Sequence, residues 1–321
     1  MWRCLTLLVF CAHVGSFATA AEVPAYPVKP VRVIAPFAAG GGVDFAARLT
    51  AQKLSAALGQ PIVVDNRPGA GGNIGTEIVA KAPADGYTLL VVSNSFTVNP
   101  SLYRKVPYDP IKDFEPVTLL TSYMLFVVGH PSFPARSIKA LIALAKAKPG
   151  GLTYGSAGSG TTTHIAGELF TYMAGVKMTH VPYKGSAPSM TAVLSGEVTL
   201  SFASTTAVPY IRSGKLMLLG VTGAKRSPRF PGVPTVAESG LPGYEATGWN
   251  ALFAPAQTPG VIVRRLSEAA GKGFKEPDAL EMLDRQDLEQ ATGTPEALAA
   301  LVRAEVTKWR KVIKAAGIEQ L

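Results

Sequence analysis

The sequence predicts an α/β protein with two similar lobes, mostly parallel sheets and a ligand cleft between the lobes. Residues 31–92 alternate apolar strands, loops and helical segments, the order that builds parallel sheets. Residues 152–202 repeat this order, although few of their residues are identical to those of the first series. Two apolar segments, 119–128 and 248–255, lie where the chain would cross between the lobes. Two lobes joined by two strands form a cleft with a hinge.

Length and composition agree with this fold class. The chain has 321 residues, which is about twice the length of an ordinary domain of ~150 residues. Hydrophobic residues make up 47% and charged residues 17%, enough for a core and too little charge for a disordered chain. The formal net charge of +9 favours anionic partners. Because the basic residues are not interleaved with aromatic ones, we expect no nucleic-acid partner.

The first 20 residues have the pattern of a cleavable signal peptide. Arg3 precedes an apolar run at residues 5–14, and Ala18-Thr19-Ala20 fits the small-x-small cleavage rule. The apolar run is shorter than the ~20 residues that span a bilayer as a helix. We therefore predict secretion with cleavage after Ala20. Both cysteines of the sequence lie in this segment, so the mature chain would have no disulfide, thiolate zinc site or cysteine nucleophile.

The first series has well-marked boundaries. We expect strands at 31–36, 62–64 and 87–92, and helices at 44–58 and in a segment ending at residue 81. Phe45, Leu49 and Leu54 lie roughly on one face of the first helix. Gly59 and Pro61 end that helix.

The second series and the tail complete the expected elements. We expect strands at 152–154, 178–181 and 198–202, and helices at 164–174 and in a segment ending at residue 194. Two further helices are expected at 259–275 and 295–316. We assign residues 21–122 and 252–321 to the first lobe, and residues 123–251, with the hinge crossings, to the second.

The candidate ligand site lies at the carboxyl ends of the strands, where open α/β sheets bind ligands. Glycines let the backbone approach a ligand closely, helix N-termini present N–H groups, and small hydroxyl residues add neutral donors. This combination suits a carboxylate or phosphate that is held without an ion pair. The candidate ligand-binding residues are Phe37, Ala39, Gly40, Gly41, Gly42, Asp44, Ser93, Asn94, Ser95, Ser156, Ala157, Gly158, Thr161, Thr162, Thr163, His164, Thr205 and Thr206.

Several of these residues have a plainer structural alternative. The loops themselves are alternatively ordinary strand-to-helix turns. Asp44 is best explained as a first-turn carboxylate that satisfies the helix end, with ligand contact as the alternative. Phe37 either forms a wall of the cleft or packs in the core. His164 is a candidate for supporting the site, whereas His180 is expected to be structural, and we expect Trp249 to pack at the hinge.

Known cofactor and catalytic motifs are missing from the sequence. It contains neither a G-x-G-x-x-G series nor a G-x-x-x-x-G-K-[ST] loop, so we expect no nucleotide cofactor. It contains neither G-x-S-x-G nor H-E-x-x-H, so we expect no catalytic residue and no metal ion. A secreted hydrolase that uses Ser156 or Ser159 with His164 stays open as an alternative.

A resemblance to a known family rests on many ordered runs between residues 26 and 318. These are YPVKP at 26–30, VRVIAPFAAGGGVD at 31–44, QPIVVDNRPGAGGNIG at 60–75, DGYTL at 85–89, YGS at 154–156, HVPYKG at 180–185 and Pro234-Thr235 followed by Glu238. With these runs the chain resembles the Bug family, the solute-binding receptors of tripartite tricarboxylate transporters.

The resemblance implies a periplasmic binding protein of the type II Venus flytrap fold, with no cofactor and no chemistry of its own. It further implies that loops 37–42 and 156–163 hold a carboxylate through backbone groups, hydroxyls and bridging water. Residues 93–95 and 205–206 are then candidates for selecting the ligand. The implied partners are a small organic anion and the large and small membrane subunits of the transporter, and a monomer is expected. A periplasmic sensor that feeds a signalling system is the alternative.

Overall fold

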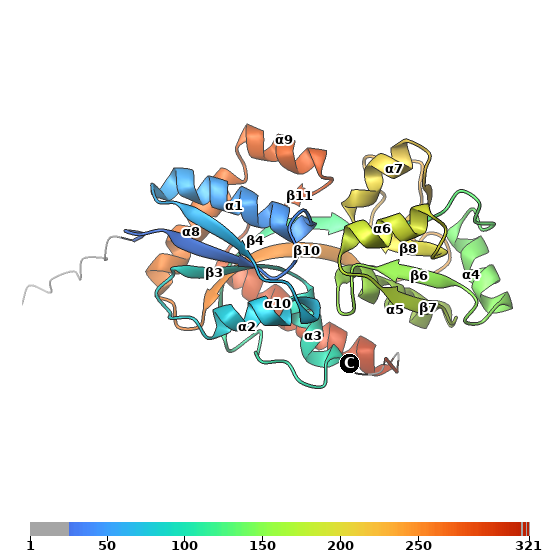
Figure 1. Cartoon of the computed structure of the whole chain (residues 1–321), viewed down its shortest axis with the longest axis horizontal. Helices are drawn as coiled ribbons and strands as arrows, with labels where there is room; N and C mark the ends of the chain where they lie inside the picture. The colour runs from blue at the N-terminus through green and yellow to red at the C-terminus, as the bar shows by residue number, and fades with distance from the viewer. Residues whose placement is uncertain (1–25, 316, 319, 321) are drawn as a thin grey trace, which may run out of the picture.

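The computed structural model describes residues 26–315, 317, 318 and 320, and the expected signal peptide lies outside them. Figure 1 shows two α/β lobes side by side, each built on one sheet with helices against it. The predicted two-lobed α/β class is therefore confirmed. No helix in this described part of the chain is both long and apolar enough to cross a membrane.

The first lobe contains a six-stranded sheet. Its strands are β1 (Val31–Ala35), β2 (Ile62–Asn66), β3 (Thr88–Ser93), β4 (Phe114–Met124), β10 (Thr247–Pro255) and β11 (Glu289–Gln290), in the order β11-β4-β10-β3-β1-β2. β1 is parallel to β2 and β3, so that Val33 pairs with both Val64 and Leu89. β10 is antiparallel to β3 and β4.

The second lobe contains a five-stranded sheet. Its strands are β5 (Phe126–Gly129), β6 (Thr153–Ser156), β7 (Thr179–Pro182), β8 (Leu200–Ala203) and β9 (Met217–Val221), in the order β7-β6-β8-β5-β9. β6 is parallel to β7 and β8, whereas β5 is antiparallel to β8 and β9. The order β2-β1-β3-β10 in the first sheet thus recurs as β7-β6-β8-β5 in the second. Each sheet is mixed and not mostly parallel as predicted, because only its repeated strand–helix unit is parallel and the strands at the crossings, β4, β5 and β10, pair antiparallel.

Helices cover both faces of each sheet. They are α1 (Gly42–Leu58), α2 (Asn73–Ala80), α3 (Ser95–Leu102), α4 (Ile138–Ala147), α5 (Thr162–Ala174), α6 (Ser186–Leu194), α7 (Val208–Arg212), α8 (Gly260–Gly273), α9 (Pro277–Arg285) and α10 (Pro295–Ala315), with short 3-10 turns at Ala70–Gly72 and Thr205–Ala207. The predicted helices agree with α1, α2, α5, α6, α8 and α10 to within a few residues. Gly59 ends α1 as predicted: its φ of 70° is left-handed, and its N–H donates to the carbonyl of Ser55.

The core is divided mainly between the lobes, but one cluster joins them, since it unites Leu102 of α3 and Trp309 of α10 with residues of the second lobe. In the first lobe, α1 and α8 pack on one face of the sheet, while Phe96 of α3 lies among Tyr108, Phe114 and Phe253 on the other. Trp249 also lies in this second cluster as part of β10, inside the first sheet. In the second lobe, α4 and α5 pack on one face, and α6 and α7 contribute to the cluster on the other.

Two adjacent antiparallel strands carry the chain between the sheets. β4 ends at Met124 and β5 begins at Phe126, while β10 begins at Thr247, which pairs with Met124. Figure 1 shows β4 and β10 reaching from the first lobe toward the second. The connections therefore lie side by side at Leu125 and just before Thr247. A hinge at this pair, and lobe boundaries at 122/123 and 251/252, stay predictions.

Candidate functional site

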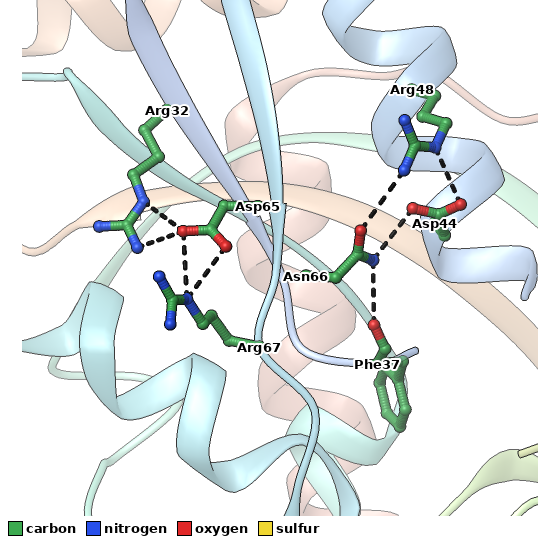
Figure 2. Close-up of polar contacts among 7 residues, drawn as sticks. All are labelled: Arg32, Phe37, Asp44, Arg48, Asp65, Asn66 and Arg67. Atoms are coloured by element: carbon green, nitrogen blue, oxygen red, sulfur yellow. Dashed lines mark hydrogen bonds and ion pairs between the residues drawn. The ribbon is translucent and has the colours of Figure 1, made fainter. Parts of the chain in front are cut away.

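The loop at residues 37–42, called here the first loop, links β1 to α1 and is held at both ends by side chains. Asp44 accepts hydrogen bonds from the Gly40 N–H at 3.0 Å and from Arg48 Nε at 2.9 Å on one carboxylate oxygen. Its other oxygen accepts from Asn66 Nδ2 at 3.0 Å. Asn66 Nδ2 also donates to the Phe37 carbonyl at 3.0 Å, as Figure 2 shows. Asp44 and Asn66 together fix the conformation of the first loop.

Asp44 is ionised in this setting. Burial by itself opposes ionisation of the carboxyl, but the hydrogen bonds from Arg48, the Gly40 N–H and Asn66 outweigh it, and the pKa of Asp44 lies below its usual value. All the contacts described for the carboxylate are with groups of the protein. The structural explanation for Asp44 therefore fits the geometry, with the loop rather than the helix end as the group it satisfies.

A separate ion-pair cluster lies on the neighbouring part of β1 and β2. Figure 2 shows Asp65 between Arg32 and Arg67, with Arg67 Nε 3.0 Å from Asp65 Oδ1. Burial opposes ionisation of Asp65, but the hydrogen bonds from the two guanidinium groups keep its pKa low. Arg32 and Asp65 stand on paired strands, so this cluster joins β1 to β2.

The N-terminus of α1 is open to a ligand. Its N-cap residue is Gly41, and no side chain of the described residues caps the helix. The first-turn N–H groups of a helix have no acceptor within the helix, so those of Gly42 and Val43 are available here. Ala39, Gly40 and Gly42 are exposed, and Phe37 is partly buried against the core.

The loop at residues 156–163, called here the second loop, links β6 to α5 and folds back on itself. The Ala157 N–H donates to Thr163 Oγ1 at 2.9 Å, and the Gly158 N–H donates to Ser156 Oγ at 3.1 Å. The Thr161 N–H donates to the Gly158 carbonyl at 3.2 Å. The protein itself therefore uses these loop amides.

The N-terminus of α5 resembles that of α1. Thr161 is its N-cap, and its hydroxyl donates to the Gly158 carbonyl and makes no cap hydrogen bond. The His164 N–H donates to the Thr161 carbonyl at 3.0 Å, which leaves the first-turn N–H groups of Thr162 and Thr163. By contrast, Ser137 caps α4 through the Ala140 N–H.

The second loop contacts the first lobe at the start of α3. The Thr162 hydroxyl donates to Asn94 Oδ1 and lies 3.3 Å from the Tyr123 hydroxyl. The Tyr103 hydroxyl donates to the Ser159 carbonyl at 3.4 Å. Sequence reasoning paired none of these residues and overlooked Tyr103 and Tyr123. The signal for Tyr123 was its place in the expected crossing.

The two remaining candidate clusters differ in position. Ser93 and Ser95 are buried next to Asn94, with their hydroxyl oxygens 3.2 Å apart. Thr205 and Thr206 begin a 3-10 turn after β8, where Thr206 Oγ1 lies 3.0 Å from Ser204 Oγ. Among the described residues, no side-chain hydrogen bond links this turn to the other three clusters.

Ser156 is paired with His180 and not with His164. Its Oγ lies 2.6 Å from His180 Nε2, whereas His164 Nδ1 accepts the Gly160 N–H at 3.2 Å. Ser156 is fully buried. The serine–histidine pair that the hydrolase alternative requires is thus absent for His164 and Ser156. Within the described ranges, no group of three or more potential ligands is arranged to hold a metal ion.

The comparison with known protein families decides the identity. The model of the tripartite tricarboxylate transporter family receptor matches residues 46–318, most of the chain. The chain belongs to this receptor family. The receptor is 36% identical over 321 residues to BugT of Bordetella pertussis, covering 99% of this chain and 98% of that protein. The resemblance to the Bug family is therefore confirmed.

Solved structures agree with this assignment. The receptor has a TM-score of 0.87 and 38% identity to Rpa4515 of R. palustris with adipate, covering 92% of this chain and 100% of that one. Its TM-score to MatC of Rhodopseudomonas palustris with bound malate is 0.82 at 33% identity, covering 90% and 100%. The family comprises periplasmic solute-binding receptors, so the receptor is a binding protein and not an enzyme. The hydrolase alternative is thereby set aside.

Proposed function

We propose that the receptor captures a small carboxylate between its lobes and delivers it to a tripartite tricarboxylate-type secondary transporter. The observation that carries this proposal is the pair of helix N-termini without a side-chain cap, α1 from the first lobe and α5 from the second. A carboxylate placed between them would accept their first-turn N–H groups and gain from both helix dipoles. The adipate of Rpa4515 and the malate of MatC support this choice of ligand class.

Neutral donors suffice for such a ligand. A hydrogen bond to a charged acceptor contributes about 1.5–3 kcal/mol, so four of them contribute about 6–12 kcal/mol before the costs of association. A micromolar dissociation constant corresponds to about 8 kcal/mol. By these values the ligand needs no ion pair for binding. Arg48, which lies beside the first loop, is already engaged by Asp44 and Asn66.

The remaining parts of the proposal concern closure and location. The contact of Asn94 with Thr162 links the lobes. Ligand binding would therefore shift the population toward this closed arrangement. We propose that Ser93, Ser95 and the turn at Thr205–Ala207 select the ligand. We also propose that the chain is exported with cleavage after Ala20. It then acts in the periplasm as a monomer, with the two membrane subunits of the transporter as partners.

Calorimetric titration tests the binding step. Mature protein, unfolded and refolded to remove bound ligand, is titrated with mono-, di- and tricarboxylates and aromatic acids. We expect one anion class to bind at one site per chain. Thr162→Ala should weaken binding by about tenfold, the value of one hydrogen bond of about 1.4 kcal/mol. Thr171→Ala is the control, because Thr171 is on the same helix but donates to the Glu168 carbonyl.

If none of the acids gives a binding signal, the carboxylate assignment is overturned. Delivery is tested separately by uptake of the labelled ligand in cells that lack the gene. Loss of uptake supports delivery to a transporter. Normal uptake together with tight binding would favour the sensor.

A further inference from the structure

Two histidines of the second lobe form a stacked pair beneath the second loop. His164 stands in the first turn of α5 and His180 in β7, and their ring centroids are 4.0 Å apart at an interplanar angle of 28°. Tyr154 of β6 also stacks on His180, with ring centroids 5.0 Å apart. His164 is 5% exposed, so its ring has little access to solvent. Neither imidazole was expected to act together with the other.

Both rings face the second loop through a nitrogen atom. His164 Nδ1 accepts the Gly160 N–H at 3.2 Å, which requires Nδ1 to carry no proton. His180 Nε2 lies 2.6 Å from Ser156 Oγ, and that oxygen accepts the Gly158 N–H at 3.1 Å. The His pair therefore orients two of the amide groups that shape the loop, one directly and one through Ser156.

Burial of the pair favours its neutral form and outweighs the one nearby carboxyl group described. Glu168 of α5 has Oε1 3.6 Å from His164 Nε2, where an ionised carboxylate would favour a proton on His164, and it accepts a hydrogen bond from the Tyr154 hydroxyl. Burial lowers the pKa of His164 to about 3, with His180 adding to the effect, and burial lowers the pKa of His180 to about 4. Burial raises the pKa of Glu168 and, more strongly, that of Tyr154, and Tyr244 donates its hydroxyl to the Ala166 carbonyl.

We propose that His164 and His180 are positioning residues, which as a neutral pair hold the second loop in its ligand-binding form and release it when protonated. This rests on the proposed function, because it adds proton control to the same site. A proton on His164 Nδ1 removes the acceptor of the Gly160 N–H. Two charged rings with centroids 4.0 Å apart would also repel each other.

The sign of the pH effect follows from the shifted values. In the unfolded chain a histidine titrates near pH ~6.5. In the folded receptor the pKa values are about 3 for His164 and about 4 for His180. The neutral pair therefore stabilises the fold above pH ~6.5, and this contribution is lost as the pH falls through the folded values. Ligand affinity should decline as the pH approaches the folded pKa values of the two histidines.

The first experiment needs no ligand. Two-dimensional ¹H–¹⁵N spectra of the imidazole rings of the refolded receptor at pH 7 should show His164 as the neutral Nε2–H tautomer. Its titration should lie at least two pH units below the ~6.5 of an ordinary histidine. Titration of both His164 and His180 near pH 6.5 would overturn the proposal even if the receptor binds a carboxylate.

The second experiment uses adipate as the probe between pH 7 and pH 4. In His164→Asn the side-chain oxygen still offers an acceptor to the Gly160 N–H but does not titrate. We expect the wild type to lose more affinity than His164→Asn as the pH falls toward 4, since protonation of adipate itself affects both proteins equally. His164→Leu should bind poorly at every pH. Parallel pH profiles of wild type and His164→Asn would refute proton control. If adipate does not bind at pH 7, the acid that binds in the calorimetric panel replaces it as the probe; if no acid binds, the proposed function fails and the spectra alone decide on the pair.

Discussion

The substitution Gly160→Ala should affect ligand binding through the contact between the lobes separately from its effect on folding stability. Gly160 belongs to the second loop, and a Cβ added there would lie 2.3 Å from Asn99 Oδ1 and 3.3 Å from Leu102 Cδ2. Asn99 and Leu102 are on α3 of the first lobe, so the new methyl group meets them across the contact between the lobes. Asn99 has little freedom to move, because its Nδ2 donates to the Gly71 carbonyl at 3.0 Å and to Asn73 Oδ1 at 2.7 Å.

The expected magnitude follows from these contacts. Overpacking of this kind costs about 1–3 kcal/mol, and loss of a hydrogen bond of Asn99 costs about 1 kcal/mol. We take about 2–3 kcal/mol for the closed form, which weakens ligand binding by roughly 30- to 150-fold. Gly160 also has a φ of 81°, and a side chain in this left-handed conformation costs about 1–2 kcal/mol in open and closed forms alike.

Gly214→Ala is the matched control. Its φ is 71°, but no atom lies within 4 Å of an added Cβ. Urea unfolding without ligand should show a similar loss of stability in both variants, while calorimetry should show weak ligand binding only in Gly160→Ala. Wild-type affinity in Gly160→Ala would refute the conclusion that these contacts belong to the ligand-bound state.

Two further predictions concern ionic contacts. Asp44→Asn should weaken ligand binding about tenfold in calorimetry, since the Gly40 N–H loses a charged acceptor. The wild type should lose stability as the pH falls through the lowered pKa of Asp44, and this loss should be smaller in the variant. The same pH dependence of the unfolding free energy in both proteins would contradict this. Arg229→Ala should weaken ligand binding about threefold and reduce the salt dependence of the affinity. The reason is that Arg229 joins Asp284 and Asp287 of the first lobe to the segment that precedes β10. Measuring the affinity at increasing salt concentration checks this. Equal salt dependence in wild type and variant would show that Arg229 does not act between the lobes.

The repeated strand–helix units were predictable because their signals are local. α1 has an apolar face at helical spacing and ends at a glycine, so sequence alone places it. α3 was missed for a physical reason. Residues 95–99 are all buried, apolar and polar alike, so this part of the helix has no exposed face and shows no amphipathic period. β10 was expected as the crossing strand at 248–255, from its place between the lobes, although eight of its nine residues are buried and such a run fits several kinds of element.

The candidate site was located by the topology but not in its details. Position after a strand and before a helix is enough to find both loops. Which amide groups are available depends on partners from distant segments, such as Asn66 on β2 and His180 on β7. No local pattern shows that Asn66 reaches the Phe37 carbonyl. The sequence therefore predicts where donors gather, and only the fold shows which of them the protein uses itself.

The engaged amides indicate how the two loops would bind the proposed carboxylate without a charged side chain. Each loop is held by its own set of acceptors, Asp44 for the first loop and Ser156, Thr163 and His164 for the second. These hydrogen bonds form when the protein folds, so the ligand does not have to order the loops. An ordered site loses less entropy on binding, which raises affinity without any added charge.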